Sequence, residues 1–148
     1  ESLMRHQCAG GLNPQYNLDP SVLIVDLYPG LSCEMLSHLL STPGVKGIVL
    51  RTYGAGNSPT TEWFIEQIRR TIERGIVVLN VTQCVNGGVH ANRYVSGDIL
   101  SAIGVISGFD ITLEAAVTKM MFLFGLGLEA NQVKYYLERP LAGEMTIS

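Results

Sequence analysis

Two residues with chemically useful side chains, Arg51 and Cys84, stand where apolar stretches of the sequence give way to polar ones. Arg51 directly follows the apolar residues 47–50, and its planar guanidinium is suited to binding a carboxylate through two parallel hydrogen bonds. An ion pair with Asp26 or another acid would use the same donors. The sequence therefore predicts either a ligand-binding arginine or a structural one.

Cys84 ends the polar stretch Thr82-Gln83-Cys84, which follows the apolar residues 76–81. A nucleophilic cysteine needs a nearby base, and His90 lies in the same polar loop. Nothing in the sequence sets the distance between the thiol and the imidazole. The pattern therefore favours a buried and inert thiol over a catalytic one.

The turn after Arg51 contains Gly54-Ala55-Gly56, which matches only the first half of a dinucleotide-binding fingerprint. The third glycine position holds Thr60 or a neighbour, and the next apolar stretch ends near Asn80 rather than at an acidic residue. The pattern favours a tight turn, in which glycines adopt positive φ, over a phosphate-binding loop.

The composition argues against several classes of function. The formal net charge of −3 gives no basic footprint for nucleic acid, and no apolar run is long enough to cross a bilayer. The beginning of the sequence, ESLMRHQCAGG, lacks the apolar stretch of a secretion signal. Cys8, Cys33 and Cys84 have no CxxC spacing, which indicates reduced thiols in a cytoplasmic protein. Since neither His6 nor His38 has metal-ligand neighbours, we expect no metal site.

Alternating strands and helices must position these side chains. The apolar runs 22–27, 47–50 and 76–81 are typical of strands buried on both faces, and residues 104–107 would add a short fourth strand. Proline suits the first position of a helix, and serine suits the cap before it. The first expected helix is capped by Ser32 and runs to Leu40, and the second starts at Pro59, with Ser58 as its cap, and ends at Gly75. A third is expected over 94–102. The fourth is capped by Asp110 or Thr112, with Asp110 the simpler choice, and the fifth covers 129–137.

This alternation predicts an α/β fold: a small three-layer, Rossmann-like domain with a parallel sheet of three or four strands flanked by helices. The 148 residues are near the commonest size of a single domain. Residues 1–19 lack periodicity and are expected to be a linker or arm, and residues 20–148 the domain. Ligands of such sheets bind outside the carboxyl ends of the strands, where Arg51 and Cys84 are both expected.

The segment 115–126 is apolar on every side of the helix that it would form. Such a helix must be buried, and a small three-layer domain cannot easily cover it alone. We expect it to lie partly in an interface with another domain or protein. A central core helix is the alternative.

Five sequence blocks resemble the C-terminal domain of cytosolic type I L-asparaginases. The blocks are LRTYGAGNSP, ERGIVVLNVTQC, YVSG, GVISGFDITLEAAVTKM and LAGEMT, and they occur in this order between Pro20 and Thr146. The resemblance implies an L-asparagine amidohydrolase, which converts asparagine to aspartate and ammonia without a cofactor. Its implied partners are an N-terminal catalytic domain, joined through the interdomain linker 1–19, and further copies in a dimer or tetramer.

The family's nucleophilic threonines lie in TGGT and DGT motifs of the N-terminal domain, and both motifs are absent here. The resemblance therefore implies no catalytic residue in this chain and no activity of the chain alone. Arg51 and Cys84 correspond to positions near which bacterial type I enzymes hold an allosteric asparagine. Asn57 corresponds to an accessory asparagine that helps to complete the substrate site. Secreted relatives continue with GNGN, whereas Pro59 replaces the second asparagine here.

Two other functions are compatible with the same blocks. A subunit of a tRNA-dependent amidotransferase shares the fold, although TQC and GVISGFDIT favour the hydrolase. A free-standing amino-acid-sensing regulatory domain would need no catalytic domain, so an upstream TGGT-containing domain would exclude it.

Overall fold

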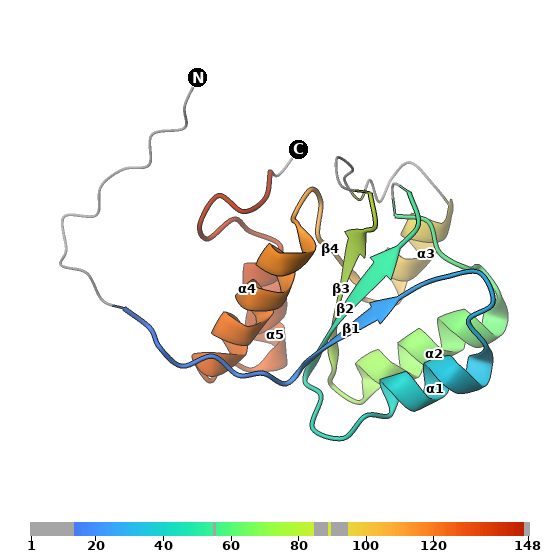
Figure 1. Cartoon of the computed structure of the whole chain (residues 1–148), viewed down its shortest axis with the longest axis horizontal. Coiled ribbons are helices and arrows are strands. Elements are labelled where there is room, and N and C mark those ends of the chain that lie inside the picture. Colours follow the sequence, from blue (N-terminus) through green and yellow to red (C-terminus); the bar gives the residue numbers. More distant parts are fainter. Residues whose placement is uncertain (1–13, 55, 85–88, 90–94, 147–148) are drawn as a thin grey trace.

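A computed structural model describes residues 14–54, 56–84, 89 and 95–146 of the chain. Ala55, His6, Cys8 and His90 lie outside the described residues. Within the described part, strands and helices alternate as expected (Figure 1). They are β1 (Val22–Asp26), α1 (Cys33–Leu40), β2 (Gly47–Thr52), α2 (Glu62–Glu73), β3 (Val77–Thr82), α3 (Val95–Ala102), β4 (Ile106–Ser107), α4 (Leu113–Gly125) and α5 (Ala130–Leu137).

The four strands form one parallel sheet in the order β1-β2-β3-β4. Because spatial order equals chain order, right-handed crossovers place the three connecting helices on the same face of the sheet. Accordingly α1, α2 and α3 lie on one face, while α4 and α5 cover the other (Figure 1). This architecture confirms the predicted three-layer α/β fold.

The sheet is buried on both faces, and side chains of β2 alternate between two apolar clusters. Ile48 and Leu50 pack with α1, α2 and α3, whereas Val49 packs with α4 and α5. The two-residue period of a strand then places Arg51 on the α4 side. This strand extends to Thr52, so Arg51 lies within the paired part of the strand rather than after it.

One expected helix start is wrong, and for another the structure decides between the two expected caps. The helix after β2 begins at Glu62 with Thr61 at the N-cap, not at Pro59 with Ser58 as its cap, because residues 58–61 are not helical and Thr61 itself is extended. The cap of α4 is Thr112, whose side chain accepts a hydrogen bond from the Ala115 N–H. Asp110 lies two residues too early to cap α4. It binds the backbone N–H of Thr146 instead.

The helix α4 is a core helix on its sheet-facing side, where Ala116, Met120 and Leu123 are buried. Its outer side is only partly covered, and Leu126 at its end is exposed. Interface burial by another domain stays a prediction. One polar side chain of α4, Lys119, is also buried. A buried cation in this apolar segment was not predicted from the sequence.

Residues 14–19 run along the far end of α4. The Asn17 side-chain amide donates to the Gly125 carbonyl over 2.7 Å, and the Asp19 N–H donates to the Met121 carbonyl over 3.0 Å. A side chain at Gly125 would lie 2.0 Å from the Asn17 carbonyl oxygen, so the close approach requires glycine. No helix among the described residues has the length and apolar character needed to span a membrane.

Candidate functional site

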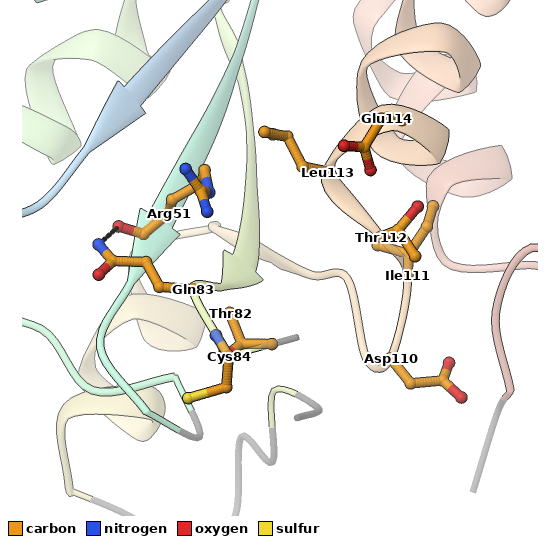
Figure 2. A pocket seen from close by; sticks show the side chains of 9 residues that line it. All are labelled: Arg51, Thr82, Gln83, Cys84, Asp110, Ile111, Thr112, Leu113 and Glu114. Carbon is orange, nitrogen blue, oxygen red and sulfur yellow. Dashed lines mark hydrogen bonds between the residues drawn. The ribbon is translucent and has the colours of Figure 1, made fainter. Parts of the chain in front are cut away.

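A pocket of about 200 Å³ lies at the carboxyl edge of the sheet. One wall comes from the ends of β2 and β3, and the opposite wall from the loop that enters α4 together with its first turn (Figure 2). The pocket brings together the two residues singled out from the sequence, Arg51 and Cys84. Its lining consists of Arg51, Thr82, Gln83, Cys84, Asp110, Ile111, Thr112, Leu113 and Glu114.

Arg51 forms the predicted ion pair with Asp26, with Nη1 lying 2.8 Å from Oδ1. The two residues are register partners at the ends of adjacent strands. The Arg51 Nε is buried and has no hydrogen-bond partner among the described residues. A guanidinium carries five N–H donors, so the ion pair leaves donors that a ligand carboxylate in the pocket can use.

Gln83, for which the sequence predicted no role, holds the strand ends that carry Arg51. Its amide Nε2 donates to the Leu27 carbonyl over 2.6 Å. It also donates to the Arg51 carbonyl over 3.0 Å, the bond drawn in Figure 2. One side chain thereby ties β3 to the segments that end β1 and β2. The only sequence signal for this role is an amide residue directly after a buried strand.

The expectation that Cys84 is buried is wrong, because β3 ends at Thr82 and Cys84 follows in an exposed bend. Its thiol is free. The Thr82 hydroxyl accepts a hydrogen bond from the Cys84 N–H over 3.0 Å and donates to the Gly54 carbonyl. His90, the base considered for a nucleophilic thiol, lies outside the described residues.

The α4 wall carries two carboxylates with different surroundings. A hydrogen bond from the Thr146 backbone N–H, 2.6 Å from Oδ1, holds the pKa of Asp110 below its ordinary value, and its carboxylate turns away from Cys84 (Figure 2). Glu114 is exposed, and its carboxylate makes no hydrogen bond or ion pair with the described residues. Its oxygens point back to the side on which Arg51 lies (Figure 2).

Asn57 does not line this pocket. It closes the turn after β2, where Tyr53 and Asn57 exchange backbone hydrogen bonds of 2.8 Å in each direction. Gly54 and Gly56 have φ of +48° and +106°, which confirms the glycine turn predicted from the sequence. The bond from Thr82 to the Gly54 carbonyl links the turn that carries Asn57 to the pocket that carries Cys84.

The pocket is lined by one cation, two carboxylates, a thiol, two threonines, a glutamine and two aliphatic side chains. Among the described residues, no group of three or more His, Cys, Asp or Glu side chains is arranged to hold a metal ion. This set of groups is suited to binding a small polar molecule with charges of both signs.

Comparison with known proteins identifies relatives of the chain. Residues 21–137 match the model of the glutaminase/asparaginase C-terminal domain. L-asparaginase 1 of Escherichia coli (strain K12) is 38% identical over 123 residues, which are 83% of this chain and 36% of that protein. The 60 kDa lysophospholipase of Mus musculus is 37% identical over 132 residues, 88% of this chain and 23% of that protein. A glutamyl-tRNA(Gln) amidotransferase subunit of Methanococcus maripaludis (strain C7) is 36% identical over 132 residues, 89% of this chain and 31% of that protein.

Among solved structures, L-asparaginase I from Vibrio cholerae superposes on the chain with a TM-score of 0.87 at 35% sequence identity. The superposition covers 94% of this chain and 42% of the other. The chain thus spans roughly a third of the length of the E. coli relative, which corresponds to one domain of it.

Proposed function

Because this chain belongs to the glutaminase/asparaginase C-terminal domain family, we propose that it is the C-terminal domain of an L-asparagine amidohydrolase. The whole enzyme would convert asparagine to aspartate and ammonia, with its nucleophiles in an N-terminal catalytic domain joined through residues 1–19. The similarity to proteins named L-asparaginase in E. coli and V. cholerae supports this proposal over other members of the family.

The pocket at the carboxyl edge would bind asparagine as an allosteric ligand. The observation that carries this proposal is that Arg51 and Cys84, which are 33 positions apart, line the same cavity. In this arrangement the Arg51 guanidinium binds the ligand carboxylate through N–H donors that the ion pair with Asp26 leaves unused. The Cys84 thiol contributes to the rim of the pocket rather than to bond cleavage.

Asn57 would serve the substrate site rather than the effector pocket, because it lies on the turn beyond Gly56 and does not line the cavity. In this role it contributes an amide to a catalytic site whose reacting groups belong to the N-terminal domain. The same proposal includes assembly into a homodimer or homotetramer, with the partly covered outer side of α4 available for contacts. The exposed free thiols Cys33 and Cys84 fit a cytoplasmic enzyme.

The similarity to the amidotransferase of M. maripaludis supports one alternative, in which the domain belongs to an enzyme that feeds ammonia to a tRNA-bound amino acid. A free-standing amino-acid sensor is the other alternative. The identity of the polypeptide segment upstream of residue 1 distinguishes the sensor from both enzymes, because only the enzymes require a catalytic domain there.

Two measurements test the proposal. The purified 148-residue chain is expected to release no ammonia from asparagine above a buffer control, whereas the full-length protein hydrolyses asparagine. Calorimetric titration of the full-length protein with asparagine is then compared between wild type and Arg51→Ala. Loss of the activating binding event in the variant supports the effector pocket, and unchanged affinity with unchanged sigmoidal kinetics removes Arg51 from it.

A further inference from the structure

We propose that Glu114 binds the α-ammonium group of the pocket's ligand, so that the pocket recognises a zwitterionic α-amino acid by both of its charges. This inference rests on the proposed effector function and adds a second recognition residue to it. Arg51 alone would accept any small carboxylate. A pocket that also binds the ammonium group discriminates against carboxylate ligands that lack an amine.

The two charges stand on opposite walls of one cavity. Arg51 comes from the end of β2, and Glu114 from the first turn of α4, across the pocket (Figure 2). A volume of about 200 Å³ is below the range of roughly 300–1,000 Å³ typical of sites for drug-sized ligands, and it suits a molecule the size of an amino acid. Apolar Ile111 and Leu113 line the wall beside Glu114.

Glu114 differs from the other acids near the pocket in the bonds that its carboxylate makes within the described part of the chain. Asp26 is paired with Arg51, and Asp110 accepts the Thr146 N–H. The Glu114 carboxylate has neither a hydrogen bond nor an ion pair there, and it points to the Arg51 side (Figure 2). A carboxylate in this position would form a charge-assisted hydrogen bond with an ammonium group.

A simpler role for Glu114 is to stabilise α4, because an acidic residue in the first turn interacts favourably with the helix dipole. Glu62 has the same role in α2, yet it does not line the pocket. Glu62→Gln is therefore a matched control, since it removes a first-turn carboxylate without changing the cavity. Only a pocket-specific role predicts a difference between the two variants in ligand discrimination.

The test compares two ligands that differ only in the amine: L-asparagine and succinamate, which is asparagine without its α-amino group. Each is titrated into the isotope-labelled 148-residue chain, and affinities are obtained from shifts of backbone amide signals around Arg51 and Cys84. Wild type is expected to prefer asparagine about fivefold, the upper range for an exposed charge pair. Glu114→Gln should abolish this preference while leaving succinamate affinity unchanged, and Glu62→Gln should retain it.

The outcomes separate this inference from the proposed function. If Arg51→Ala weakens both ligands but Glu114→Gln leaves the ratio of their affinities unchanged, the pocket is confirmed as a carboxylate site and the role of Glu114 is overturned. If neither ligand perturbs signals around Arg51, both the effector pocket and the role of Glu114 are overturned. The ratio of affinities is insensitive to a uniform loss of folded protein, so a destabilised variant does not mimic the expected result.

Discussion

Arg51 and Asp26 are register partners at the carboxyl ends of β2 and β1, and their side chains form an ion pair of 2.8 Å. The cation proposed to bind a ligand carboxylate is therefore already paired with a carboxylate of the protein itself. The Asp26 side chain is half exposed, so it can release the guanidinium without leaving a buried charge. In the proposed site, the ligand and Asp26 would compete for one arginine.

Asp26→Asn should accordingly increase the affinity of the chain for L-asparagine. Exposed ion pairs are worth about 0.2–1 kcal/mol, so removing the competitor is expected to raise affinity by up to about fivefold. Titration followed by backbone amide shifts measures the change. Asp19→Asn is the control, because Asp19 pairs with Lys46 before β2 and does not line the pocket. An unchanged or weaker affinity in Asp26→Asn would show that Asp26 orients Arg51 rather than competing for it.

Lys119→Met should destabilise the domain strongly. The Lys119 ammonium lies 2.8 Å from Glu144 and also donates to the Leu137 and Arg139 carbonyls, and the two side chains are only 4% and 12% exposed. Removing one partner of a buried ion pair typically costs about 3–5 kcal/mol, because the other charge remains buried. Urea unfolding measures the loss.

The double variant Lys119→Met/Glu144→Gln should recover part of that stability, since it leaves no unpaired charge behind. A double variant as unstable as the single one would indicate that lost packing, rather than an isolated carboxylate, explains the effect. The comparison also tests whether residues 138–146 are held on α4 and α5 mainly by this pair.

The same pair predicts a loss of stability in acid. Burial opposes ionisation of Glu144, but hydrogen bonds from Lys119 and from the Leu141 and Ala142 N–H groups outweigh it and lower the pKa to about 2. A folded-state pKa below the ordinary value of 4.5 stabilises the fold at higher pH. This contribution should decline as pH falls from about 4.5 towards 2.

The measurement is the difference in unfolding free energy between wild type and Glu144→Gln across this pH range. The difference should shrink as the pH falls, whereas the exposed control Glu73→Gln should show no comparable convergence. If the difference in unfolding free energy between the two proteins stays constant from pH 5 to about 2.5, the pKa of Glu144 is not lowered in the folded state relative to the unfolded state.

Thr52→Val should also destabilise the domain, because it leaves the buried side-chain oxygen of Asn80 without its hydrogen-bond donor. The Thr52 hydroxyl donates to the Asn80 Oδ1 over 2.7 Å between β2 and β3, and the two residues are 0% and 3% exposed. Valine has a similar shape but no donor, so the expected loss is about 1–3 kcal/mol for a buried acceptor. Thr118→Val on the exposed side of α4 is the control, and equal effects of the two variants would contradict the argument.

Much of the fold was predictable because its strands are continuous apolar runs. Residues 22–27, 47–50 and 76–81 correspond to β1, β2 and β3 with shifts of one or two residues at their ends. The helix starts were less predictable, since capping depends on the path of the chain. Ser58 and Pro59 have the right residue types, yet they directly follow the turn closed by Asn57 and lie outside the helix, which begins at Glu62.

Only part of the candidate site could be predicted from the sequence. Arg51 lies near the end of β2 and Cys84 follows β3, and neighbouring parallel strands bring their carboxyl ends to one edge. Glu114 and Gln83 could not be found in this way, because their roles depend on contacts distant in sequence. Gln83 binds carbonyls of Leu27 and Arg51, and the first turn of α4 reaches the pocket only after the chain has crossed to the other face of the sheet.

The strand order β1-β2-β3-β4 has a consequence for the folding of the domain. Each strand pairs with the next strand in the chain through a crossover that contains one helix, so the sheet consists of three successive βαβ units. Packing of α4 against β1 closes a much longer loop than any of these units, at a higher cost in chain entropy. Because one wall of the pocket belongs to α4, the proposed site is complete only once this contact has formed.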